Sequence, residues 1–130
     1  MRPRSFVPAA ALLALLCQLP AQAQTAAADP QVARGQRLFL RCVACHDAVD
    51  SKLVKIGPNL KGVVGRQAGR QAGFNYSKAM AAQNFKWEEA KLHAWLQRPN
   101  AVVPGTSMVF EGMPIEADRK ALIAYLATQR

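Results

Sequence analysis

The sequence predicts a small all-α domain in which three main helices are joined by glycine-rich loops. Apolar residues recur at helical spacing after position 30, around position 92 and again near the C-terminus. Between the first two of these stretches the chain is rich in glycine and lysine and shows no sustained periodicity. No segment alternates polar and apolar residues for long enough to indicate a strand. These observations favour helices packed around one core over any sheet-based fold.

The first residues indicate export from the cytoplasm. Arg2 and Arg4 precede an apolar stretch at 6–16, and Ala21-Gln22-Ala23 matches an A-x-A cleavage site. The stretch is short for a membrane span, so we expect a cleaved signal peptide and a periplasmic protein, with an uncleaved anchor as the alternative. The expected organisation is a signal peptide, a flexible N-terminal tail and one folded domain, at residues 1–23, 24–30 and 31–130.

A first helix is expected to start at Asp29-Pro30, because aspartate is a favoured N-cap and proline is tolerated in the first turn. The residues that follow at helical spacing are Val32, Gly35, Gln36, Phe39 and Val43. Gly35 is unfavourable in the middle of a helix. We therefore expect either the close approach of another helix at this glycine or a tolerated defect.

The segment after this helix carries the most specific motif in the chain, Cys42-Val43-Ala44-Cys45-His46. Two thiols separated by two residues, with a histidine directly after the second, are the attachment signature of a c-type haem. Each thiol can add to one vinyl group of the same porphyrin, and the histidine can supply an imidazole nitrogen to the iron. A structural disulfide or half of a zinc site are the alternatives, but a zinc site needs two more ligands and only Cys17 and His93 remain.

Two further helices and a loop are expected in the second half of the chain, after a short helix that Ser77 can cap. Glu88-Glu89 suit the first turn of a helix that Pro99 ends, and Asp118 lies near the start of the last helix. A loop opened by Pro104-Gly105 separates them. The apolar residues expected to be buried in these two helices are Leu92, Trp95, Leu96, Leu122, Ile123, Tyr125 and Leu126.

The occupant of the second axial position of a haem iron distinguishes electron transfer from ligand chemistry. After position 23, the candidates are His93 and the methionines Met80, Met108 and Met113. Met108 is the prediction because it lies on the Pro104-Gly105 loop, which can be held rigid, and because a thioether favours the reduced metal. A buried core methionine would look the same in the sequence, and Met113 is the main competitor. His93 lies off the apolar stripe of its helix and is expected at the surface.

Six further segments make the chain resemble a class I cytochrome c of the mitochondrial type, in its periplasmic bacterial form. They follow family order and spacing between about Gln31 and Gln129: Gly57-Pro58-Asn59-Leu60, Gly65-Arg66, Gly73-Phe74-Asn75-Tyr76, Trp87, Pro104-Gly105-Thr106-Ser107-Met108 and Leu122-Ile123-Ala124-Tyr125-Leu126. The resemblance implies the class I cytochrome c fold and a soluble, monomeric one-electron carrier that is not an enzyme. It implies redox partners such as a quinol–cytochrome c oxidoreductase and a terminal oxidase, in a respiratory or photosynthetic chain.

The resemblance also implies roles for individual residues. Those implied to contact the haem are Cys42 and Cys45 through thioethers, His46 and Met108 through the iron, and Tyr76, Trp87, Arg66 and Thr106 through a propionate. The carbonyl of Pro58 would accept a hydrogen bond from the other ring N–H of His46 and fix its tautomer. Gly35 and Phe39 would pack against Tyr125 where the first and last helices cross.

The chain departs from the family pattern in three places. Trp95 stands where the family usually has a tyrosine near the methionine sulfur, and Met80 stands where it often has asparagine, so the polarity around the sulfur is altered. No lysine or arginine occurs between positions 99 and 115, where the family typically places several lysines. We therefore expect partner docking to depend more on apolar contact around Val102, Val103, Val109 and Phe110 than on electrostatic steering.

Charge limits the remaining function classes. The formal net charge is +9, and +7 remains once the two arginines of the signal peptide are removed. The basic residues are scattered and have no stacking aromatic residues among them, which argues against nucleic acid. We expect an acidic protein partner, with a merely solvated basic surface as the alternative. The alternative functions are an electron-transfer subunit bound to a specific dehydrogenase, and a haem peroxidase or gas-binding protein with an open sixth position.

Overall fold

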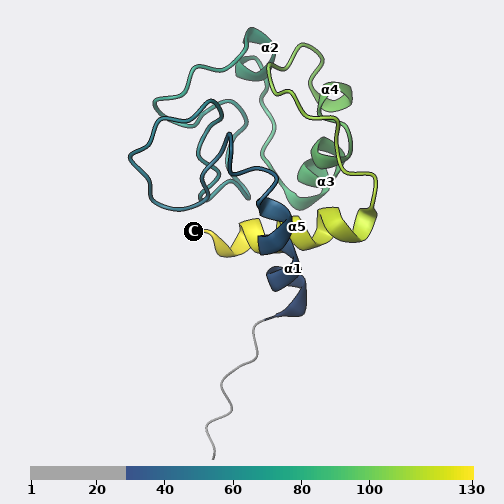
Figure 1. Cartoon of the computed structure of the whole chain (residues 1–130). Helices are drawn as coiled ribbons and strands as arrows, with labels where there is room; N and C mark the ends of the chain where they lie inside the picture. Colours follow the sequence, from purple (N-terminus) through teal and green to yellow (C-terminus); the bar gives the residue numbers. More distant parts are fainter. Residues whose placement is uncertain (1–28) are drawn as a thin grey trace, which may run out of the picture.

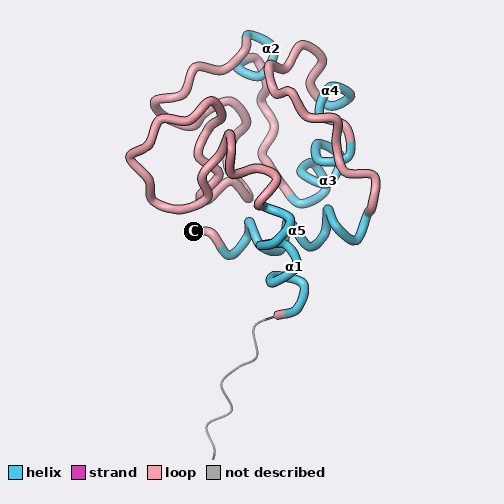
Figure 2. The backbone as a smooth tube through the Cα atoms, viewed as in Figure 1, coloured by secondary structure: helices cyan, strands magenta, loops and turns pink. Residues whose placement is uncertain are grey.

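The computed structural model describes residues 29–130, and the expected signal peptide and most of the expected tail lie outside this range. The helices are α1 (Pro30–Phe39), α2 (Lys78–Ala81), α3 (Glu89–Gln97), α4 (Pro99–Val102) and α5 (Glu116–Thr128). Long loops join α1 to α2 and occupy one side of the molecule (Figures 1 and 2). The only β-type pairing in this part of the chain is an isolated bridge between Gln67 and Lys86. The prediction of an all-α fold with three main helices is confirmed.

None of the helices within residues 29–130 combines the length and the apolar character needed to cross a bilayer.

The first helix begins where its capping residues predict. The side chain of Asp29 accepts a hydrogen bond of 2.8 Å from the backbone N–H of Gln31, and Pro30 occupies the first turn. Toward its C-terminal end α1 crosses α5 (Figure 1). A Cβ atom on Gly35 would lie 2.0 Å from the carbonyl oxygen of Ala121, on α5. Of the two explanations for this glycine, the close approach of another helix is therefore correct.

Side chains reinforce the crossing of α1 and α5. The rings of Phe39 and Tyr125 lie 5.4 Å apart between centroids, and an aromatic pair in a tilted geometry stabilises such a contact. Arg34 and Asp118 form an ion pair between the same two helices. The expected packing of Gly35 and Phe39 against Tyr125 is present, and it holds the two ends of the described chain together.

The third and fourth helices show one feature that the sequence analysis missed. Pro99 ends α3 as expected, but it also starts the short helix α4. The break lies at Arg98, whose backbone is extended with a φ of −159°. Proline is incompatible with the interior of a helix and well suited to the first turn of a new one. The sequence analysis applied only the first of these two effects.

The core corrects one expectation about the surface. Val103, which was expected to contribute to docking, is 0% exposed, whereas Val109 is 99% exposed. The N–H of Val103 donates to the carbonyl of Pro99, so the chain turns inward directly after α4. The sequence contains two adjacent valines here, and their order alone does not tell which of them faces the core.

Candidate functional site

The Cys42–His46 segment forms compact turns directly after α1. The N–H groups of Cys45 and His46 both donate to the carbonyl of Cys42, at 3.0 and 2.9 Å. These turns leave Cys45 exposed, Cys42 half-buried and His46 buried. The segment therefore presents two thiols and one imidazole from a single short stretch of backbone.

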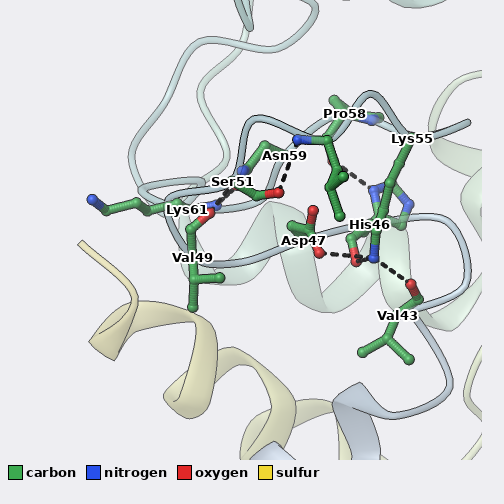
Figure 3. A network of polar contacts seen from close by, with 10 residues as sticks. Val43, His46, Asp47, Val49, Ser51, Lys55, Pro58, Asn59 and Lys61 are labelled. Carbon is green, nitrogen blue, oxygen red and sulfur yellow. Dashed lines mark hydrogen bonds and ion pairs between the residues drawn. The ribbon is translucent and has the colours of Figure 1, made fainter.

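The His46 ring is held from behind by the loop that contains Pro58. Its Nδ1 lies 2.7 Å from the Pro58 carbonyl oxygen. Figure 3 marks this contact with a dashed line. A carbonyl oxygen can only accept, so Nδ1 carries the proton and donates. This is the hydrogen bond that the resemblance implied. It leaves Nε2 as the ring nitrogen with a lone pair, which is the form that binds a metal.

Gly57 completes the wall behind this ring. A Cβ atom at position 57 would lie 2.4 Å from Cε1 of His46, so only glycine leaves room for the imidazole. Burial lowers the pKa of His46, the Pro58 carbonyl raises it, and Lys55 lowers it. The net direction is downward, which favours the neutral imidazole that ligation requires.

The two cysteines are free thiols, so the structural-disulfide alternative is not realised. Burial raises the pKa of the Cys42 thiol, an effect that Arg41 opposes in part. Within residues 29–130 no group of three or more His, Cys, Asp or Glu side chains could hold a metal ion, and Cys17, a ligand of the zinc alternative, lies outside these residues. Two unpaired thiols beside a neutral, oriented imidazole fit covalent attachment and ligation of a c-type haem.

A polar network surrounds the outer side of the same segment (Figure 3). The ammonium group of Lys55 lies 2.6 Å from the carbonyl oxygen of Val43, 3.2 Å from that of His46 and 2.7 Å from the Asp47 carboxylate. The hydrogen bond from Lys55 holds the pKa of Asp47 below its usual range. In the sequence Lys55 is only one of several scattered basic residues, because no periodic pattern marks a contact within an irregular loop.

Three of the four residues implied to bind a propionate lie together. The backbone N–H of Trp87 donates to the carbonyl of Arg66 at 2.8 Å. Arg66 and Tyr76 are close enough that each affects the pKa of the other: burial lowers the pKa of Arg66 and raises that of Tyr76, and their interaction opposes both shifts. The guanidinium of Arg66 also donates to the carbonyls of Lys61 and Asn59, so part of its donor capacity is already used.

Thr106 lies beside Met108 instead. The N–H of Met108 donates to Oγ1 of Thr106 at 3.3 Å. This local hydrogen bond holds the backbone of the loop at Met108. Met108 is partly buried and packs against the core, whereas Met113 is 2% exposed. The N–H of Met113 donates to the carbonyl of Leu96 at 2.7 Å, so this competitor is packed against α3 as a core residue.

The structure corrects the expectation that His93 is a solvated surface residue. His93 is half-buried, and its Nε2 lies 3.4 Å from Nε of the buried Arg119. Arg119 also donates to the carbonyls of Met113 and Pro114, at 2.5 and 2.8 Å. The α5 guanidinium thus binds the loop that contains Met108, a role that periodicity could not reveal because arginine is mostly exposed in helices.

The residue expected near the methionine sulfur, Trp95, belongs to a buried aromatic group. Its ring lies 5.1 Å from that of Trp87, and Trp87 lies 4.8 Å from Phe85, both in edge-to-face geometry. Met80 is also buried in this core. These two of the three departures from the family pattern are therefore interior changes.

Replacing Gly57 by alanine is expected to displace the His46 imidazole. The new methyl group would overlap the ring, and overpacking of this kind costs about 3 kcal/mol or drives the ring off the Pro58 carbonyl. The measurement is the His46 ring resonances and the visible spectrum of the purified holoprotein. Gly62→Ala is the control: Gly62 has a φ of +65° but no atom within 4 Å of an added Cβ, so it should lower stability slightly and leave the His46 signals unchanged. Unchanged His46 signals in Gly57→Ala would contradict the expected clash.

Comparisons with known proteins agree with this geometry. A family model described as Cytochrome c matches residues 32–130. Cytochrome c2 of Rhodomicrobium vannielii is 45% identical over 104 residues, which cover 80% of this chain and 82% of that protein. Cytochrome c2 of Rhodoblastus acidophilus is 43% identical over 101 residues, covering 78% and 92% respectively. The solved structure of cytochrome cH from Methylobacterium extorquens matches with a TM-score of 0.69 and 40% identity, over 75% of this chain and 97% of that chain.

Proposed function

The chain belongs to the cytochrome c family, and from this premise we propose how its residues hold the haem and where it works. It is a class I cytochrome c and carries a covalently attached haem c with iron. It is an electron carrier similar to cytochrome c2, and it is not an enzyme.

Cys42 and Cys45 would form the two thioether bonds to the haem, and His46 would hold its iron through Nε2. The observation that carries this assignment is the hydrogen bond from His46 Nδ1 to the Pro58 carbonyl at 2.7 Å, with Gly57 leaving room for the ring in this position. The carbonyl makes the imidazole more electron-rich and prevents its rotation. A rigid ligand keeps the geometry of the site similar in both oxidation states.

Met108 is the sixth ligand. The loop that contains it is bound on one side by Arg119 through the carbonyls of Met113 and Pro114. Thr106 fixes the backbone at Met108 itself. When bound, the haem iron supplies a one-electron couple between ferric and ferrous states, and a thioether ligand raises its potential. A filled sixth position keeps substrates away from the metal.

The propionates are held by Tyr76, Trp87 and Arg66, with Thr106 as a further donor. A carboxylate folded inside a protein requires hydrogen-bond donors and a nearby cation. The half-buried Arg66 guanidinium beside the Tyr76 hydroxyl supplies both. Arg66 therefore has two tasks, because its guanidinium also binds the carbonyls of Lys61 and Asn59.

The protein works in the periplasm and exchanges electrons with membrane complexes such as a quinol–cytochrome c oxidoreductase and a terminal oxidase. The A-x-A site before residue 24 and the bacterial cytochrome c2 relatives support this location. Charge supports an acidic partner: residues 29–78 contain nine basic and three acidic side chains, and residues 79–130 contain six and five. Val109, which is almost fully exposed, offers apolar contact on the Met108 loop.

Two measurements on the exported holoprotein test this function. Mass spectrometry should show one covalent haem on the chain after residue 23, and the ferric protein should show the weak far-red band of methionine–iron ligation. The ferrous protein should not bind carbon monoxide at neutral pH, because Met108 fills the sixth position. Ready carbon monoxide binding without the far-red band would instead indicate a gas-binding or peroxidase function.

A further inference from the structure

Lys55 binds the haem-attachment segment from its outer side. We propose that Lys55 is a positioning residue for this segment and that its fixed positive charge raises the reduction potential of the bound haem. The inference rests on the proposed ligation by His46 and goes beyond it, because it assigns a role to a residue outside the attachment motif. Figure 3 shows the residues that carry it.

The ammonium group of Lys55 has three donors, and the structure provides three acceptors. They are the carbonyls of Val43 and His46, at 2.6 and 3.2 Å, and the carboxylate of Asp47 at 2.7 Å. The side chains of Lys55 and Asp47 are only 23% and 19% exposed. A partly sheltered ammonium is stable only when its hydrogen bonds are satisfied, so this geometry is specific and differs from that of a freely solvated lysine.

The contacts of Lys55 belong to a larger set of hydrogen bonds between its loop and the Cys42–His46 segment. The N–H of Gly57 donates to the carbonyl of Cys45 at 2.8 Å, between the two carbonyls that Lys55 binds. The carbonyls of residues 43, 45 and 46 are thus all bound by the loop that leads to Pro58. This loop also accepts the His46 ring proton at Pro58, so backbone and side chain of the ligand are held by one element.

The positive charge of Lys55 affects the oxidised and reduced states of the haem iron differently. Oxidation adds one positive charge to the iron site, and a sheltered cation beside the ligand opposes that addition. Lys55 therefore favours the reduced state, and Asp47 offsets part of its effect. Because Lys55 and Asp47 are partly buried, dissolved salt screens their effect on the iron less than it screens that of surface charges.

The test compares Lys55→Met, Lys55→Arg and the matched control Lys52→Met in the full holoprotein. Lys52 is an exposed lysine on the same loop. Lys55→Met should shift the electron equilibrium with a fixed redox mediator about two- to tenfold toward the ferric form. It should also speed hydrogen exchange of the Gly57 and His46 amides by about tenfold or more, because the hydrogen bonds between the loop and the segment open more often. Lys52→Met should leave the exchange rates unchanged, and Lys55→Arg should keep the equilibrium near the original value.

A second variant keeps the proposal testable if Lys55→Met yields no holoprotein. Asp47→Asn removes the carboxylate and leaves both carbonyl contacts of Lys55, so the equilibrium should shift toward the ferrous form. The proposal is overturned if Lys55→Met matches Lys52→Met in both measurements, or if Asp47→Asn shifts the equilibrium toward the ferric form or not at all. Failure of the proposed ligation would be recognised separately, as the absence of the far-red band in the unmodified holoprotein.

Discussion

Replacing Gly35 by alanine is expected to destabilise the protein by about 3–5 kcal/mol, one of the largest effects of any single-methyl change in this chain. Alanine has the higher helix propensity, and on an exposed helix the same substitution would stabilise by about 1 kcal/mol. Here the added Cβ would lie 2.0 Å from the Ala121 carbonyl oxygen and 2.7 Å from Cβ of Tyr125. Both contacts involve atoms that cannot rotate away, so α1 and α5 must move apart.

Urea unfolding of the holoprotein measures this effect. Gln36→Ala is the matched control, because Gln36 is the next residue of α1 and is exposed. We expect it to be neutral or slightly stabilising through helix propensity alone. A stability of Gly35→Ala equal to or above that of the unmodified protein would show that the two helices can separate without cost, and that their close approach is not needed.

Replacing Met108 by alanine is expected to remove the sixth ligand and open the iron. The far-red band should disappear and the ferrous form should bind carbon monoxide. The reduction potential should fall by on the order of 100 mV or more, because the thioether favours the ferrous state. Met108 is only partly buried, so the accompanying loss of folding stability should be smaller than that of a core methionine.

Met113→Ala is the control for this experiment and should give the reverse pattern. Met113 is 2% exposed, and truncating a buried methionine costs about 2–5 kcal/mol of stability. The far-red band should persist as long as the protein is folded. Retention of the band in Met108→Ala, together with its loss in Met113→Ala, would exchange the two roles and identify Met113 as the ligand.

Several parts of this molecule could be predicted from the sequence because they depend on neighbouring residues. The cap at Asp29 and the cap at Ser77 lie within three residues of the N–H groups that they accept from. The spacing of Cys42, Cys45 and His46 is set by the size of one porphyrin. The helical periodicity of α5 follows from its own sequence.

Other features needed the folded chain. The sequence left open why a glycine stands in the middle of α1, and the structure shows that α5 packs directly against it. The second effect of Pro99, the burial of Val103 and the contact between His93 and Arg119 were missed or wrongly expected. For Pro99 and Val103 the reason is the length of α4, because a four-residue helix has too few residues to show a periodic pattern. For His93 the reason is a contact between α3 and α5 that neither helix shows in its own sequence.

By itself the sequence determined the helical fold class and the covalent attachment of a haem, and it predicted His46, whose ring donates to Pro58, as an iron ligand. Only the tertiary structure decided which groups hold that ligand in place: Gly57 against the ring, and Lys55 across the carbonyls of Val43 and His46. The physical reason is the kind of interaction involved. Caps, periodicity and covalent spacing are local and leave a pattern along the chain, whereas a lysine that binds backbone carbonyls in an aperiodic loop is positioned by the path of that loop in space.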